Sequence, residues 1–213
     1  MPWAPSYASL DELRDYVRIS DDADDIVMST ALDAASRAID HACDPRVNRV
    51  RQFGRTETAQ PRYYTATSRG FDVANYGQWV AETDDIADPL GSIEVAVFSA
   101  GVWVEVLGCA VLPRNAAAIG WPGTSILFPG ALVPTQIADG VRVTTEWGWP
   151  EIPGTIHQAA LLQASRLLAR REAPFGVAGS PETGTEIRLL ARLDPDVETM
   201  VRPFSRKLGA VLA

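Results

Sequence analysis

The side chains best suited to chemistry are few and scattered along the chain. A thiolate beside an imidazole can act as a nucleophile, and neighbouring carboxylates can act as general acid and base. The candidates are His41 with Cys43, a lone His157, and the carboxylates Asp84, Asp85 and Asp88. Neither histidine stands in a metal-recruiting spacing, and the sequence has no phosphate-binding glycine loop, nucleophile elbow or Cys-x-x-Cys pair. We therefore predict no catalytic set, no metal site and no cofactor, in a protein that is not an enzyme.

An acidic cluster at Asp21, Asp22, Asp24 and Asp25 could supply oxygen ligands to calcium. A calcium loop of the EF-hand type also needs a glycine at its sixth position and a bidentate acid at its end, and both are missing here. Carboxylates at the start of a helix are favoured by the helix dipole. We therefore interpret the cluster as the beginning of a helix.

Composition and charge limit the class of protein further. The 213 residues, 46% of them hydrophobic and 22% charged, suffice for one or two small globular domains. The formal charge of -8 argues against a surface that grips nucleic-acid phosphates. The first seven residues lack the features of a signal peptide, and no apolar run is long enough to span a membrane. Cys43 and Cys109 are expected to be buried apolar residues rather than a disulfide.

The elements that must position these groups begin with two helices. Ser9 and Glu12 form a capping box, in which each side chain satisfies a free backbone N–H group, and this predicts a helix near 10–17. Apolar residues then recur every three or four positions and predict a longer helix near 22–43. Its face from Ala31 to Ala42 is rich in small residues. Such a face allows close packing, either inside the chain or against another subunit.

Two more helices are predicted near the end of the chain. Pro153 fits the first turn of a helix near 153–171, because a missing N–H group costs nothing there. The apolar face of this helix, from Ile156 to Leu168, is again suited to a core or to lateral packing. Asp194 as N-cap and Pro195 at the first position predict a last short helix near 195–202.

The middle of the chain shows no helical period. Runs rich in β-branched and aromatic residues at 93–98, 102–107 and 141–147 predict strands, and Ser99-Ala100-Gly101 fits a hairpin turn between the first two. Frequent glycine and proline residues between these runs indicate loops. We therefore predict an α+β fold: a small helical core from residues 1–44 and 148–203, an inserted and mostly antiparallel β region at 45–147, and a C-terminal tail at 204–213.

A cationic corner at the end of the third predicted helix is the best candidate for a partner contact. A positive helix end is also favourable by itself, because it complements the helix dipole. Beside a flexible apolar loop, it could pair with an acidic neighbour. The corner comprises Arg166, Arg170, Arg171, Pro174, Phe175, Gly176 and Val177. The tail adds a second candidate set, Phe204, Arg206, Lys207 and Leu208.

The order of motifs in the C-terminal half resembles the head-tail connector (adaptor) proteins of actinobacterial siphophages. A strand from Val141 leads through Gly148-Trp149-Pro150 into a helix that ends in Arg170-Arg171. A loop then leads to Asp194-Pro195-Asp196 and a short helix. The opening segment 7–13 and the helix ending at Asp44 are similar to the first helices of this family. The resemblance covers nearly the whole chain, although about a hundred residues are added between the second and third helices.

This resemblance implies a structural protein of the virion neck, made in the host cytoplasm. Such connectors form rings, typically of twelve copies, between the portal protein and a stopper or tail-completion protein. They extend the channel through which viral DNA passes without sequence-specific binding. A closed ring requires two different faces of one subunit to match. A channel lined with carboxylates would repel the DNA backbone, and the tail could order on docking to the portal.

A binding module for a glycan or receptor is the alternative reading. It would use tryptophans of the β region as surface anchors. The residues concerned are Trp79, Trp103, Trp121, Trp147 and Trp149. Tryptophans spread among strands and turns also serve as core packing, so their burial separates the two readings.

Overall fold

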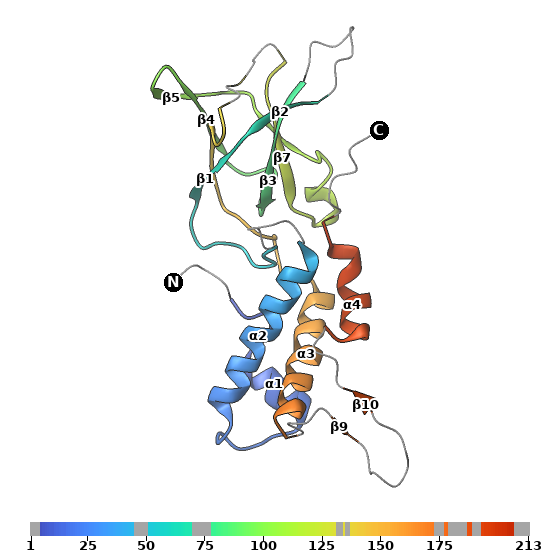
Figure 1. Cartoon of the computed structure of the whole chain (residues 1–213). Helices are drawn as coiled ribbons and strands as arrows, with labels where there is room; N and C mark the ends of the chain where they lie inside the picture. The colour runs from blue at the N-terminus through green and yellow to red at the C-terminus, as the bar shows by residue number, and fades with distance from the viewer. Residues whose placement is uncertain are drawn as a thin grey trace. The chain divides into compact units, whose positions relative to one another are not determined.

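The structure is a computed structural model that describes residues 5–44, 51–69, 78–130, 134, 137–172, 177–178, 187–188 and 193–206. It contains four α-helices and a set of mostly antiparallel strands, which confirms the α+β prediction (Figure 1). The chain divides into two compact units. A helical unit comprises Met1–Phe53 with Ile152–Ala213, and a β unit comprises Gly54–Glu151.

The helical unit is built from both ends of the chain. Helix α1 spans Leu10–Val17, α2 spans Asp25–Cys43, α3 spans Gly154–Glu172, and α4 spans Pro195–Val201. A short 3-10 turn, η2 (Arg202–Phe204), follows α4, and the two-residue strands β9 (Val177–Ala178) and β10 (Ile187–Arg188) pair with each other. Helices α2 and α3 pack side by side (Figure 1).

The ends of the short helices follow from local chemistry. The capping box of Ser9 and Glu12 is present, with the Ser9 N–H donating to the Glu12 carboxylate at 2.8 Å. Those bonds from Ser9, with a contribution from His157, lower the pKa of Glu12 to about 2. Asp194 caps α4, and Pro195 is at its first turn, as predicted.

The small-residue face of α2 is part of the core of the helical unit. Ala35 and Ile39 are fully buried, and so are Ile156, Ala160 and Ala164 on α3. Since α2 and α3 pack against each other, these apolar faces are used within the subunit. The apolar faces at Ala31 to Ala42 and Ile156 to Leu168, which the sequence left open as core or lateral packing, therefore contribute to the core of this unit.

The β unit contains two four-stranded sheets. One has the strand order β1-β8-β4-β5 and the other β2-β3-β7-β6. The strands are β1 (Gln60–Tyr64), β2 (Ala66–Arg69), β3 (Gln78–Ile86), β4 (Glu94–Ser99), β5 (Val102–Glu105), β6 (Ala110–Leu112), β7 (Gly123–Leu127) and β8 (Val141–Thr145), with a 3-10 turn η1 (Ala117–Ile119). All neighbouring strands are antiparallel. The hairpin turn between β4 and β5 is confirmed, with Ala100 and Gly101 at positive φ.

The core of the β unit lies between these sheets. It gathers alternate residues of the strands with one tryptophan, as the period-two pattern of half-buried strands requires. The buried residues include Tyr64, Ala81, Ile86, Val95, Val97, Ile126, Val141, Val143 and Trp147.

Several predicted boundaries were wrong by a few residues. Helix α2 begins at Asp25 rather than near 22, because the first acidic residues form a turn in which the Ala23 N–H donates to Asp21. Pro153 precedes α3, and its carbonyl accepts the N–H groups of Ile156 and His157. Strand β8 ends at Thr145, before the turn at Gly148. Strand β7 lies in a stretch that was predicted to be loop.

Candidate functional site

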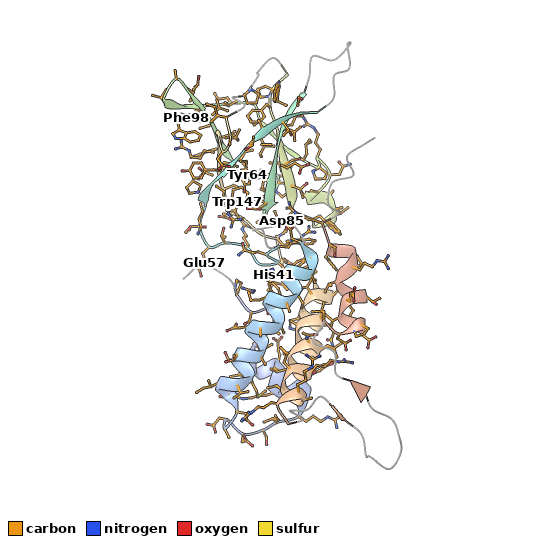
Figure 2. All side chains as sticks on the ribbon, viewed as in Figure 1. His41, Glu57, Tyr64, Asp85, Phe98 and Trp147 are labelled. Atoms are coloured by element: carbon orange, nitrogen blue, oxygen red, sulfur yellow. The ribbon has the colours of Figure 1, made fainter. Side chains whose placement is uncertain are left out.

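The Trp-Gly-Trp motif after β8 is a tightly bonded structural turn of the β unit. The N–H of Trp147 donates to the Thr56 hydroxyl at 2.9 Å, and its carbonyl accepts the Thr56 N–H at 2.8 Å. The Gly148 N–H donates to the Asp85 carbonyl at 2.7 Å, and the Trp149 indole donates to the Asp85 carboxylate at 3.0 Å. Trp147 and Asp85 are labelled in Figure 2. The motif therefore fixes the end of β8 to β3 and to the segment before β1.

The carboxylates that could have formed an acidic site have separate structural partners. Asp84 pairs with Arg62 at 2.8 Å and accepts the Tyr64 hydroxyl at 3.0 Å. Burial, with the nearby Asp84, raises the pKa of the Tyr64 hydroxyl above its usual value. Asp88 accepts the N–H of Leu90 in a turn. The arrangement holds strands and turns together and offers no paired general acid and base.

The histidines and cysteines are also placed apart. His157 lies 3.1 Å from Glu12, and His41 is exposed on α2. Cys43 is fully buried and contacts the carbonyl of Val201, while burial raises the pKa of the Cys109 thiol to about 11. Among the described residues, no group of three His, Cys, Asp or Glu side chains could hold a metal ion.

The acidic cluster at the start of α2 uses two of its members in ion pairs. Asp25 pairs with Arg14, and Asp24 lies 2.7 Å from Arg171. Asp24 is the N-cap residue by position, but its side chain makes no capping hydrogen bond. The cluster therefore ties α1 and α3 to the start of α2, and it lies at the beginning of a helix, as predicted.

The cationic end of α3 has intramolecular partners. Arg166 pairs with the buried carboxylate of Asp194, and Arg171 pairs with Asp24 while its side chain remains 59% exposed. Arg170 lies in the same last turn. Pro174, Phe175 and Gly176 lie outside the described residues, whereas Val177 belongs to β9. The structure thus brings the three arginines to one helix end and assigns two of them a structural role.

Asp194 is the buried anchor of α4. Its carboxylate accepts the N–H groups of Asp196 at 2.7 Å and Val197 at 3.3 Å, and its own N–H donates to Gln163 at 3.1 Å. We expect Asp194→Ala to lower the free energy of unfolding by about 2 kcal/mol or more, because a cap is worth about 1 kcal/mol and Arg166 also loses its partner. Urea denaturation of the full chain measures the loss. Asp194→Asn is the control, because it keeps the cap acceptor and removes only the charge. Equal stability of Asp194→Ala and wild type would contradict the assignment.

Described segments from the N-terminal and C-terminal parts of the chain contact each other near the C-terminal end of α2. The ring of Phe53 packs edge-on against Tyr7 at 5.7 Å and against Phe204 at 5.9 Å between ring centroids. Arg51 donates to the Phe204 carbonyl, and the N–H of Arg206 donates to the Cys43 carbonyl at 2.7 Å. Phe204 and Arg206 therefore belong to the folded helical unit, while the predicted contact residues Lys207 and Leu208 lie outside the described residues.

Asp40 is a buried carboxylate next to these contacts. Asp40 is 2% exposed, accepts the hydroxyl of Tyr7, and lies 3.0 Å from the Arg37 guanidinium. The Tyr7 hydroxyl in turn accepts the N–H of Phe53 at 3.0 Å. Burial raises the pKa of Asp40 to about 7, although Tyr7 and Arg37 lower it.

A groove of about 400 Å³ lies beside this cluster in the helical unit. Its walls come from the end of α2, the residue before Asp194, and α4 with η2. They are formed by Ala42, Leu193, Glu198, Val201, Arg202 and Ser205. Its mixed apolar and charged lining can take part in a protein contact but holds no catalytic pair.

The tryptophans do not form a common surface. Trp147 and Trp149 are 0% and 2% exposed, and Trp121 is 38% exposed with its ring 5.2 Å from Trp149. The reading of the tryptophans as one surface for a glycan or receptor was therefore wrong for these two buried members. Trp79 on β3 and Trp103 on β5 are both half-buried, and Trp79 packs against the core of the β unit.

Comparison with known proteins finds similarity among solved structures alone. No family model matches the chain, and no curated protein matches it. Among solved structures, the chain is similar to one described as the neck of a native GTA particle computed with C12 symmetry. The TM-score is 0.45 at 16% sequence identity, and the match covers 98% of this chain and 96% of that chain. Within the described part of the chain, we find no helix long and apolar enough to cross a membrane.

Proposed function

We propose that this chain is a non-enzymatic structural subunit of the neck of a phage virion, a head-tail connector that forms a ring. The observation that carries the proposal is the ordered set of connector motifs, which the fold realises as consecutive elements. Strand β8 leads through the Gly148 turn into α3, and Asp194-Pro195 starts α4 against it. The finer assignment, to the type found in actinobacterial siphophages, rests on the sequence motifs alone.

The chemistry of such a subunit is association with its own copies, with a portal protein and with a stopper or tail-completion protein. The apolar faces of α2 and α3 are buried in the core of the helical unit. Contacts in the ring must therefore use exposed charged surfaces and the β unit. The groove beside α4 and the exposed Arg171 are the candidates in the helical unit. Twelve copies in the ring are part of this proposal.

The acidic balance is concentrated in the β unit. Residues Gly54–Glu151 contain eleven acidic and five basic residues. If this unit lines the channel of the ring, its carboxylates repel the DNA backbone and let the DNA pass without capture. A channel lined mainly by arginine in the assembled ring would contradict this part of the proposal.

Cryo-electron microscopy of the virion neck tests the proposal directly. We expect a closed ring of this chain between the portal and the tail. A neck that lacks the chain would overturn the proposal.

Charge reversal at the end of α3 tests the contact surface of the ring. We expect Arg171→Glu to reduce portal-dependent ring assembly by at least tenfold, measured by native mass spectrometry of the chain mixed with portal rings. Asp24→Asn is the matched control, because it breaks the same intramolecular pair but leaves the arginine available. An exposed ion pair of this kind usually contributes little to stability. Equal loss in both variants would therefore show that Arg171 acts through its pair with Asp24 within the subunit, and not through a contact with a partner.

A further inference from the structure

One face of the sheet β1-β8-β4-β5 is turned away from the core of the β unit. Strand pairing puts Tyr63 opposite Arg142, Arg142 opposite Ala96, and Ala96 opposite Glu105. Directly paired residues share a face of a sheet, so these four side chains form one row across it. Their neighbours along the strands, such as Tyr64 and Val141, point to the opposite face and into the core. The row therefore belongs to the outer face.

An aromatic cluster covers part of this outer face. The ring of Trp103 lies 5.3 Å from Phe98 and 5.7 Å from Tyr63, measured between ring centroids. The Arg142 guanidinium lies over the Trp103 ring at 5.1 Å from its centroid. Tyr63 remains 50% exposed. The cluster thus combines rigid aromatic surface with hydrogen-bond donors whose position is fixed by stacking.

A hollow of about 240 Å³ opens beside this cluster. Ala96 contributes only a methyl group to its floor, which leaves room between the longer side chains around it. The lining residues are Glu94, Val95, Ala96, Trp103, Glu105, Arg142 and Thr144. Pockets for drug-sized ligands have about 300–1,000 Å³, so this hollow is suited to a single small ring or to one unit of a longer ligand.

The polar groups around the hollow restrict the chemistry of its occupant. Glu94 and Glu105 are exposed acceptors, Arg142 is a donor, and the Thr144 hydroxyl can do both. Within the described part of the chain, neither glutamate forms an ion pair. Two carboxylates disfavour an anion, a cation would leave the Arg142 donors unused, and an apolar ligand would displace water from these groups without replacing its hydrogen bonds. A neutral ligand with several hydroxyl groups satisfies all of them.

We propose that the outer face of the sheet β1-β8-β4-β5 binds one neutral pyranose unit of a glycan in the hollow beside Trp103. The apolar C–H face of the sugar packs against the aromatic cluster, the carboxylates of Glu94 and Glu105 accept its hydroxyl protons, and Arg142 donates to its oxygens. This binding activity is independent of the connector role. A ring can form without it, and the loss of one does not remove the other.

Saturation of the full-length protein with simple sugars tests this site. The probes are the methyl pyranosides of mannose, galactose, glucose and N-acetylglucosamine, with glucuronic acid and glucosamine as charged counterparts. Binding is followed by NMR on the tryptophan indole N–H signals. We expect at least one neutral probe to give a saturable shift of the Trp103 signal at millimolar concentration, while the buried Trp147 signal stays unchanged. No saturable shift with any neutral probe, or tighter binding of a charged probe, would overturn the proposal.

Two exposed glutamates provide variants that keep the fold. We expect Glu94→Gln combined with Glu105→Gln to weaken sugar binding at least tenfold, because both charge-assisted hydrogen bonds become neutral ones. Glu57→Gln is the matched control, since Glu57 is also an exposed glutamate of the β unit but does not line the hollow. Equal binding by the double variant and the control would assign the shift to a different site and refute the role of these two carboxylates.

Discussion

Replacing Gly148 by alanine is expected to lower the free energy of unfolding of the β unit by more than about 4 kcal/mol, which is a large part of the stability of an ordinary domain. A Cβ atom at this position would lie 1.7 Å from the carbonyl oxygen of Gly54, and backbone atoms cannot rotate away as a side chain can. The residue also has a φ of +108°, which L side chains rarely adopt. Thermal or urea denaturation, followed by the fluorescence of the buried tryptophans, measures the loss.

Two other glycines separate the causes of this effect. Gly101 has a φ of +86° but nothing within 4 Å of its added Cβ, so Gly101→Ala should cost only about 1 to 2 kcal/mol. Gly130 has open space around it and no positive φ, so Gly130→Ala should be close to neutral. If Gly148→Ala lowered the free energy of unfolding no more than Gly101→Ala, the close contact between Gly148 and the backbone of Gly54 would be contradicted.

The position of Gly148 gives the Trp147-Gly148-Trp149 motif a physical reason. Only glycine allows the segment after β8 to pass the backbone at Gly54, and the two flanking tryptophans are then fixed by hydrogen bonds to Gln60 and Asp85. The same motif that supports the proposed family thus has a structural task in the β unit. The motif alone therefore cannot identify a partner-binding residue.

The helices were predictable because their signals are local. The capping box at Ser9 and the Asp194-Pro195 start need only a few neighbouring residues, and both are present in the fold. Strand β3 was missed because it carries Glu82, Asp84 and Asp85, residue types that are depleted in strands. Its acidic residues are tolerated because Arg62, Tyr64 and Trp149 supply partners from elsewhere in the β unit.

The candidate contact residues could be found in the sequence, but their partners in the fold could not. A cluster of arginines at a helix end is visible in the sequence, but the pairing of Arg166 with Asp194 joins residues that only the fold brings together. The hollow beside Trp103 was missed for a similar reason. The alternation of Glu94, Ala96 and Phe98 indicates one face of a strand, but the strand register is needed to place Arg142 and Glu105 on either side of Ala96.

A change of Asp40 to asparagine is expected to alter how the stability of the helical unit depends on pH. Burial raises the pKa of Asp40 from 3.8 to about 7, so the folded state holds a proton that the unfolded state releases. The contribution of this proton is fully present below pH 3.8 and is lost as the pH rises through about 7. A tenfold change in an equilibrium constant is about 1.4 kcal/mol, and the two pKa values of Asp40 differ by about three factors of ten, so the loss amounts to roughly 4 kcal/mol.

Asparagine at this position stays neutral at every pH and still accepts the hydrogen bond of the Tyr7 hydroxyl. Asp40→Asn should therefore gain stability relative to wild type between about pH 4 and pH 8, by up to roughly 4 kcal/mol. Urea denaturation over this range measures the difference, and Asp15→Asn is the control because Asp15 is exposed on α1. A constant difference between Asp40→Asn and wild type would mean that Asp40 is ionised throughout, with Arg37 compensating for the cost of its burial.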